Sequence, residues 1–168
     1  SGVINVLKDV NLELGNGVTA ILGPNGAGKT TLIKICTDLL NFDEGQVAYC
    51  GKDLKSMTKK EKSQTFSLLS EGSRNLYYKL TPLENIKYFA TLRGLSFETI
   101  KEYSLNLFQK LNLYEKKNEM VENLSRGMQQ KVAVVCALSM KTPVTFLDEP
   151  TLGLDLESSI NLSKFLRS

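Results

Sequence analysis

Several segments of the chain carry the patterns of apolar and polar residues that are typical of strands. Apolar and polar residues alternate over 10–14, which predicts a half-buried strand. A continuous apolar run over 18–22 predicts a fully buried strand. Similar short runs predict further strands over 45–50, 66–69 and 144–147. Strands are therefore expected on both sides of a central stretch that is mostly helical.

In other segments the apolar residues recur every three to four positions, as they do along one face of a helix. Helices are expected over 29–40, 81–92, 97–111, 125–139 and 157–166. The start of the second helix is marked by Thr81 as the N-cap, by Pro82 at the first helical position and by Glu84, which completes a capping box. Strands that alternate with helices indicate an α/β fold with a mostly parallel sheet.

The composition is that of a globular chain of one domain. Its 168 residues are 42% hydrophobic and 23% charged, which excludes disordered and collagen-like chains. The formal net charge of +3 is too small to indicate nucleic-acid binding, and no nucleic acid is expected as a partner. The lysine-rich segment 51–64 is interpreted as a solvated loop with a short helix. No apolar run is long enough to predict a membrane span.

Histidine is absent from the sequence, which excludes any mechanism that requires a histidine within these residues. The three cysteines, Cys36, Cys50 and Cys136, fit no zinc-binding or disulfide spacing. We therefore expect them to be reduced, buried thiols of a cytosolic protein.

The segment that follows the strand at 18–22 matches the phosphate-binding pattern G-x-x-x-x-G-K-[ST]. Its residues are Gly23, Pro24, Asn25, Gly26, Ala27, Gly28, Lys29 and Thr30. Backbone N–H groups of such a turn point inward, and the helix that follows adds the positive end of its dipole. We expect Lys29 to reach the β- and γ-phosphates of a nucleotide and the Thr30 hydroxyl to bind Mg²⁺.

Two carboxylates follow the apolar strand at 144–147. In proteins with a phosphate loop, an Asp on a neighbouring strand holds Mg²⁺, and Asp148 fits this role. Glu149 comes one residue later, at the position of a general base for a water beside the γ-phosphate. ATP and Mg²⁺ are therefore the expected ligands, and ATP hydrolysis is the expected reaction.

Two further segments resemble motifs of the ABC ATPases. Leu124-Ser125-Arg126-Gly127-Met128-Gln129-Gln130 resembles the family's signature motif, LSGGQ, and its Ser125 lies 23 residues before Asp148, as is usual in the family. The sequence Pro-Thr-Leu-Gly-Leu-Asp over 150–155 resembles the family's D-loop. The phosphate loop, signature, acidic strand and D-loop stand in the family's order, so the resemblance covers essentially the whole chain.

The resemblance implies a P-loop NTPase core with a mostly parallel sheet, an inserted helical subdomain and N-terminal antiparallel strands. In a single ABC ATPase domain, the nucleotide-binding core would cover 1–70 and 126–168, and the helical subdomain 71–125. Members of the family work as head-to-tail dimers that enclose two ATP molecules. A second ATP-binding subunit is therefore an expected partner.

The same resemblance assigns roles to residues. ATP and Mg²⁺ would bind along the segment from Gly23 to Thr31. Ser125 and Gly127 would touch the γ-phosphate that the other subunit binds, and Asp155 would meet the phosphate loop of that subunit. A serine hydroxyl, a glycine N–H and a helix N-terminus together suit an anion.

The sequence departs from the family's pattern in two places. Arg126 and Met128 stand where Gly and Gln are usual, and Arg126 either adds charge at the dimer interface or is simply solvated. The family also places a glutamine that senses Mg²⁺ after the strand at 66–69. Here Glu71 lies nearest to that position, either as a further Mg²⁺ ligand or as a plain loop residue.

Two features that the resemblance implies fall outside the sequence. The family's switch histidine lies well beyond the catalytic glutamate, and only 19 residues follow Glu149. The aromatic residue that stacks on adenine would precede residue 1. Both ends are therefore expected to be trimmed, and these 168 residues alone are expected to bind ATP weakly and to hydrolyse it slowly.

The function that follows from the resemblance is that of an ATP-hydrolysing subunit of an ABC transporter, at the cytoplasmic face of the membrane. It would couple to a separate integral membrane permease through 71–95, where Leu76, Tyr77 and Tyr78 are either contacts or buried core. Segment 71–78 resembles ATP subunits of bacterial exporters, so export is expected. A soluble ABC ATPase that acts on ribosomes and a P-loop kinase for a small molecule are the alternatives.

Overall fold

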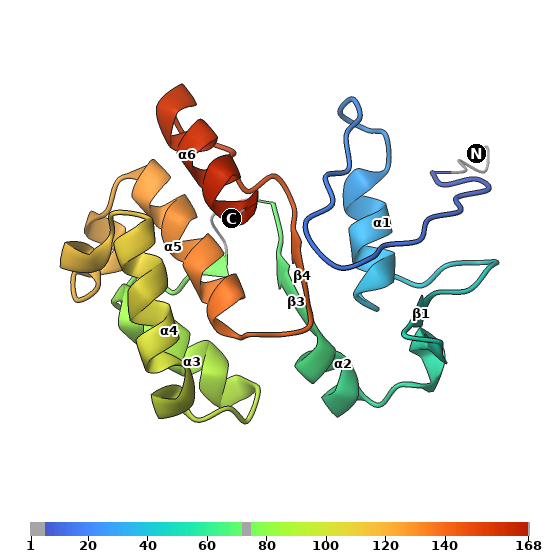
Figure 1. The fold of residues 1–168 in the computed structure, drawn as a ribbon, viewed down its shortest axis with the longest axis horizontal. Coiled ribbons are helices and arrows are strands. Elements are labelled where there is room, and N and C mark those ends of the chain that lie inside the picture. Colours follow the sequence, from blue (N-terminus) through green and yellow to red (C-terminus); the bar gives the residue numbers. More distant parts are fainter. Residues whose placement is uncertain (1–5, 72–74, 168) are drawn as a thin grey trace. The chain divides into compact units, whose positions relative to one another are not determined.

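The computed structural model of the chain describes residues 6–71 and 75–167. The chain divides into two compact units, Ser1–Lys62 and Ser63–Ser168 (Figure 1). Both helices and strands are present, with one antiparallel and one parallel pair of strands among the described residues. The expected α/β class with parallel and antiparallel strands is therefore confirmed.

The first unit is built around one helix and one small hairpin. Helix α1 covers Lys29–Cys36, and the strands β1 (Ala48–Tyr49) and β2 (Lys52–Asp53) pair antiparallel. Cys50 and Gly51 connect the strands, with φ of 47° and 79°. Positive φ at both central residues is typical of a type I′ hairpin turn. Because Cys50 lies at this turn, its thiol is exposed rather than buried as expected.

Helix α1 ends at Cys36, earlier than the expected Leu40. The helix stops because Asp38 adopts a left-handed conformation, with φ of 60°. The Asp38 N–H donates to the Ile35 carbonyl (3.1 Å), and the Leu39 N–H donates to the Lys34 carbonyl (2.8 Å). These two bonds form a Schellman motif, which closes a helix at its C-terminus.

The expected strands at 10–14 and 18–22 are not strands in the structure. These residues are exposed, and Leu22 has 90% of its surface accessible. A strand is held by ladder hydrogen bonds to a neighbour, and no described residue pairs with either segment in this way. The prediction of strands from the alternation over 10–14 and from the apolar run over 18–22 is therefore wrong.

The second unit contains a parallel pair of strands with helices packed against it. Strands β3 (Phe66–Leu69) and β4 (Val144–Leu147) pair in register, as expected from their apolar runs. The ladder continues one residue beyond β4, where the Asp148 N–H donates to the Leu69 carbonyl (2.8 Å). The remaining elements are α3 (Pro82–Leu92), α4 (Phe97–Lys110), η3 (Tyr114–Lys116), η4 (Val121–Asn123), α5 (Arg126–Ser139) and α6 (Leu156–Arg167). Two short elements, η1 (Leu54–Ser56) and α2 (Lys59–Thr65), precede β3.

Helix α5 lies at the centre of the apolar core. Its residues Val132, Val134 and Val135 are fully buried, together with Ile86 of α3 and Phe108 of α4. A helix whose buried residues lie on several faces must be surrounded by other elements, and α5 contacts α3, α4, β3 and β4. The apolar run over 132–138 therefore belongs to the core. Within the described ranges, no helix has the length and apolar character that a membrane crossing requires.

The start of α3 carries the capping box that the sequence predicts. The Thr81 hydroxyl accepts from the Glu84 N–H (3.2 Å), and the Glu84 carboxylate accepts from the Thr81 N–H (2.8 Å). The bond from the Thr81 N–H stabilises the charged carboxylate and lowers the pKa of Glu84. Two N–H groups that the helix cannot satisfy itself thus find partners.

Loss of this cap should destabilise the protein. We expect Thr81→Ala to lower the free energy of unfolding by about 1 kcal/mol, because the Glu84 N–H loses its acceptor. In a chain of this size that corresponds to a decrease in Tm of about 2–4 °C in a thermal unfolding experiment. Thr91→Ala, an exposed change in the same helix that keeps the cap, is the matched control. Equal losses for the two variants would contradict a stabilising cap.

Candidate functional site

The glycine-rich segment forms a turn that leads directly into α1. Gly28 is the N-cap of the helix with φ of 85°, and Gly26 has φ of 81°. The Ala27 N–H donates to the Pro24 carbonyl (3.2 Å), and the Leu32 N–H donates to the Gly28 carbonyl (2.8 Å). The structure thus confirms a tight, glycine-dependent turn at a helix N-terminus.

The Lys29 side chain closes over this turn. Its ammonium group donates to the carbonyls of Gly23 (2.8 Å) and Pro24 (2.9 Å). The first N–H groups of a helix have no helical partners, and the helix dipole adds positive potential at that end. The turn therefore combines a cation and a helix N-terminus, which suit a phosphate group. It also carries the Thr30 hydroxyl, whose oxygen is a type of ligand that suits a hard cation.

The two carboxylates predicted as functional lie at the end of β4. Asp148 is buried, with 4% of its surface accessible, and its N–H extends the ladder to Leu69. Glu149 is half-buried and has a φ of 49°. A left-handed conformation costs a non-glycine residue about 1–2 kcal/mol. Such strain persists only where the surroundings hold it, and it is common at functional sites.

A turn connects Glu149 to α6. The Leu152 N–H donates to the Glu149 carbonyl (3.0 Å), and the Leu154 N–H donates to the Thr151 carbonyl (3.1 Å). Asp155 ends the turn and caps α6, where its carboxylate accepts from the Ser158 N–H (2.8 Å). This bond stabilises the charged carboxylate and lowers the pKa of Asp155.

The segment that resembles the signature motif lies at the start of α5. Ser125 is exposed and is the N-cap of the helix, with its hydroxyl accepting from the Met128 N–H (3.3 Å). Gly127 lies beside the turn that follows Glu149, because a Cβ atom placed on it would be 3.4 Å from Cδ2 of Leu154. The structure thus brings Gly127 close to the D-loop segment.

Two glutamines in this motif have roles that the sequence did not reveal. The side-chain amide of Gln129 donates to the carbonyls of Val121 and Leu124, both at 3.0 Å. The amide of Gln130 donates to the carbonyls of Pro150 (3.1 Å) and Glu149 (3.5 Å). The second pair of bonds joins positions about twenty apart in sequence, and only the three-dimensional structure identifies it.

Glu71 lies two residues beyond β3 and is exposed. The neighbouring Ser70 carbonyl accepts from the side-chain amide of Asn75 (2.7 Å). Residues 72–74, part of the segment that resembles exporter subunits, lie outside the described residues. Glu71 therefore remains a predicted ligand. Among the described residues, no three potential metal-binding Cys, Asp or Glu side chains cluster together.

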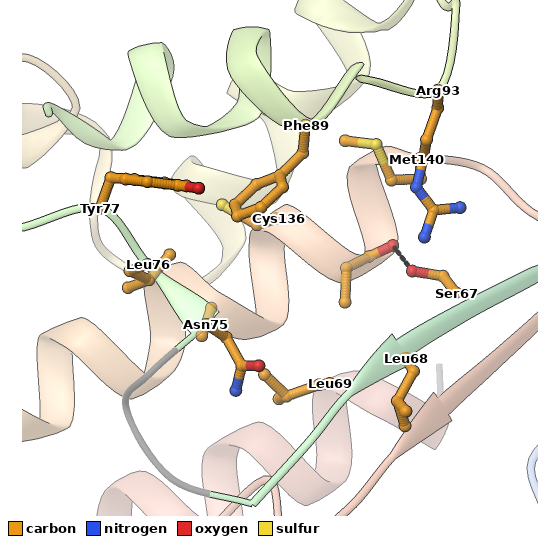
Figure 2. Close-up of a pocket in the computed structure, with 12 residues that line it drawn as sticks. Ser67, Leu68, Leu69, Asn75, Leu76, Tyr77, Phe89, Arg93, Cys136 and Met140 are labelled. Atoms are coloured by element: carbon orange, nitrogen blue, oxygen red, sulfur yellow. Dashed lines mark hydrogen bonds between the residues drawn. The ribbon is translucent and has the colours of Figure 1, made fainter. Parts of the chain in front are cut away.

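A cavity of about 420 Å³ lies between β3, α3 and α5 (Figure 2). Leu68 and Leu69 of β3, Phe89 of α3, and Cys136 and Met140 at the end of α5 line it, among others. Of the three candidate contacts in 71–95, Leu76 is buried, Tyr78 is half-buried and Tyr77 has 48% of its surface accessible. Tyr77 also lines the cavity. This residue is therefore both exposed to solvent and part of the cavity wall.

Arg93, the residue that follows α3, lines the same cavity (Figure 2). Its guanidinium donates to the carbonyls of Ser63 (2.8 Å) and Phe66 (3.0 Å). Burial removes water from the cation and lowers the pKa of Arg93. Tyr77 lines the cavity as well, and its hydroxyl group lies 2.9 Å from that of Tyr88. The cavity is therefore lined by polar as well as apolar groups.

Comparison with known proteins places these features in a family. A family model described as ABC transporter matches residues 7–152. The ABC transporter ATP-binding protein NatA of Bacillus subtilis strain 168 is 36% identical over 98% of this chain and 67% of its own length. The methionine import ATP-binding protein MetN of Clostridioides difficile strain 630 is 33% identical over 98% of this chain and 52% of its own length. The chain thus spans about half to two thirds of these relatives.

A solved structure has a similar fold. It is a dimeric structure of the ATP-binding cassette MJ0796, described as a post-hydrolysis state bound to ADP and Pi. It is 26% identical to this chain, with a TM-score of 0.81 over 96% of this chain and 73% of that one. The fold described above is therefore that of the ATP-binding cassettes.

The two glycines of the turn offer a matched test of its geometry. Gly28→Ala should destabilise the protein more than Gly26→Ala, by about 1 kcal/mol in the free energy of unfolding. Both residues have positive φ. A Cβ atom on Gly28 would lie 2.7 Å from Cδ2 of Leu7 and 3.2 Å from the Val6 carbonyl oxygen. A Cβ atom on Gly26 would have no atom of the described residues within 4 Å, apart from its chain neighbours. Urea unfolding measures the difference. Equal losses would show that residues 6 and 7 do not pack on the turn.

Proposed function

This chain belongs to the ABC transporter family, and from that membership we propose that it binds and hydrolyses ATP as one subunit of a transporter. The observation that supports the proposal is the turn before α1, where a left-handed Gly28 and the Lys29 side chain lie at a helix N-terminus, an arrangement that would suit an anion. The acidic end of β4 supplies the second group that ATP hydrolysis requires.

We assign the nucleotide to the segment from Gly23 to Thr31. The two carbonyls to which Lys29 donates are neutral acceptors. A phosphate group is negatively charged and accepts stronger hydrogen bonds than a neutral carbonyl does. The Lys29 ammonium group can therefore exchange these carbonyls for a β- or γ-phosphate. From the family resemblance, Thr30 and Asp148 are each proposed as Mg²⁺ ligands, and Glu71 as a further ligand. Mg²⁺ neutralises the charge of the phosphates in the transition state.

In this proposal Glu149 is the general base. Its carboxylate takes a proton from the attacking water, whose oxygen bonds to the γ-phosphorus while the bond to the ADP oxygen breaks. No covalent intermediate is needed, and no histidine is needed for the proton transfer. The protein contributes position and charge rather than covalent chemistry.

We further propose that two subunits associate head to tail and enclose two ATP molecules. Ser125 and Gly127 of one subunit would contact the γ-phosphate on the other, and Asp155 would meet the opposite phosphate loop. The solved relative MJ0796 is described as dimeric, which supports this arrangement. The exposed position of Ser125 at the N-terminus of α5 is compatible with a ligand from another subunit.

The membrane partner is proposed to be a separate permease that contacts 71–95 from the cytoplasmic side. Support comes from the cavity beside Tyr77, where an exposed aromatic residue and a partly apolar recess could receive a segment of the permease. Export is proposed from the resemblance of 71–78 to exporter subunits. The name of the relative MetN states import for that protein, so direction depends on the permease.

The dimer can be tested through Ser125. We expect Ser125→Ala to reduce the ATP turnover of the full-length protein by about 100-fold while ATP affinity changes little, because the serine acts on the nucleotide of the other subunit. Glu149→Gln should lose turnover to a similar extent. Turnover is measured as phosphate release, and affinity by equilibrium binding of a labelled ATP analogue.

Mixing the two inactive variants provides the decisive control. A Ser125→Ala subunit paired with a Glu149→Gln subunit contains one site with both defects and one intact site, so part of the activity should return. No return of activity would contradict the head-to-tail arrangement. Unchanged turnover in Ser125→Ala alone would favour a monomeric phosphotransferase.

The transporter assignment predicts a membrane partner. We expect the full-length protein, purified from its native membranes in mild detergent, to bring with it a multi-span membrane protein that mass spectrometry identifies. Tyr77→Ala should weaken this association, whereas Tyr103→Ala, a change at an exposed tyrosine of α4 outside 71–95, should not. Recovery of the wild-type protein only in the soluble fraction or with ribosomes would move the function away from transport.

A further inference from the structure

The side chain of Gln130 is buried and polar, and its partners lie at the candidate catalytic turn. It has 7% of its surface accessible. Its amide donates to the Pro150 carbonyl at 3.1 Å and to the Glu149 carbonyl at 3.5 Å. A buried amide is retained in a core only when its hydrogen bonds are satisfied, and here both acceptors belong to residues directly after Asp148.

The backbone at this point offers few polar groups by which it can be held. The peptide between Glu149 and Pro150 has no N–H, because proline lacks one. The orientation of that peptide is therefore fixed through the Glu149 carbonyl, which accepts from the Leu152 N–H (3.0 Å) as well as from Gln130. Since Glu149 is held at a φ of 49°, the surroundings must maintain a conformation that the residue alone does not favour.

Gln130 also connects this turn to the start of α5. It lies five positions after Ser125 on the same helix. Gly127 lies beside the other end of the turn, because a Cβ atom placed on it would be 3.4 Å from Cδ2 of Leu154. The first turns of α5 therefore touch the segment 149–154 at two points, one polar and one apolar.

We infer that Gln130 is a positioning residue, whose side-chain amide holds the backbone of Glu149 and Pro150 so that the Glu149 carboxylate is presented for proton transfer. This inference rests on the proposed role of Glu149 as the base. It has a structural consequence: the helix that carries Ser125 at its N-terminus also sets the orientation of Glu149. A nucleotide that binds at Ser125 and displaces α5 would thus also shift the Glu149 carboxylate of the same subunit.

Gln130→Met tests the inference in the full-length protein. Methionine has a similar volume but no donor, so the two carbonyls lose the amide. We expect kcat for ATP to fall about 10- to 100-fold through misplacement of the base, with KM changed by less than about twofold. Gln130→Arg, which restores N–H donors at this position, should return kcat to within about threefold of wild type.

A double-variant cycle separates positioning from general damage. If Gln130 acts through Glu149, Gln130→Met should cause no further loss of turnover in a protein that already carries Glu149→Gln. Val134→Ala is the matched control: Val134 lies four positions further along α5 and is fully buried in the hydrophobic core. It should lower Tm without lowering kcat.

The outcomes distinguish this inference from the proposed function. Wild-type kcat in Gln130→Met, a multiplicative loss in the double variant, or failure of Gln130→Arg to restore turnover would overturn the positioning role and leave the role of Glu149 intact. Unchanged turnover in Glu149→Gln alone would overturn the proposed base, and the positioning role with it.

Discussion

The parallel ladder between β3 and β4 is the interaction on which the candidate site residues of the second unit depend. It runs in register from Phe66 opposite Val144 to Leu69 opposite Leu147, and the Asp148 N–H extends it. The carboxyl ends of parallel strands meet at one edge of a sheet, and this edge is where ligands bind in open α/β folds. The ladder therefore fixes the backbone of Asp148 before any functional side chain contributes.

The turn after Asp148 combines a strained residue with several local restraints. The left-handed conformation of Glu149 costs about 1–2 kcal/mol. A typical hydrogen bond contributes about 1 kcal/mol net, so the bonds that the turn accepts from Leu152 and Gln130 are comparable in size to the strain. The conformation of Glu149 is thus restrained both by its own turn, through Leu152, and by α5, through Gln130.

The sequence predicted those elements whose ends carry local chemical signals. Thr81 and Glu84 define the start of α3, Ser125 defines the start of α5, and β3 has the expected limits. Prediction failed where the outcome depends on distant partners. The alternation over 10–14 describes a strand only if another strand pairs with it. The sequence did not predict the end of α1 at Cys36, because Asp38 takes a conformation that is usually adopted by glycine.

The candidate site shows the same division. The residues of the phosphate loop, Asp148 and Glu149 could be proposed from spacing alone, because each motif is continuous in sequence. The contact of Gln130 with Pro150 could not, because a buried amide has no preferred partner until the fold brings one within reach. The roles of these residues stay predictions, whereas the structure gives the backbone geometry of the phosphate loop and of the turn after β4.

The distribution of acidic residues at helix starts bears on those roles. An Asp or Glu in the first turn offsets the positive end of the helix dipole. Of the described α-helices, α2, α3, α4 and α6 carry such a residue in Glu61, Glu84, Glu98 and Glu157. Helices α1 and α5 carry none, and each instead begins with a cation, Lys29 or Arg126.

A cation at a helix N-terminus is electrostatically unfavourable in the isolated chain, by a few tenths of a kcal/mol to about 1 kcal/mol. Helix α2 also begins with a cation, Lys59, but Glu61 in its first turn offsets the charge. The described α-helices that have a cation and no acidic residue in the first turn are α1 and α5, whose N-termini are proposed to meet phosphate groups. An acidic residue at either position would stabilise the subunit alone but would repel the nucleotide. If both helices meet phosphate groups as proposed, the charge pattern at their N-termini favours the ligand-bound state over the stability of the single chain.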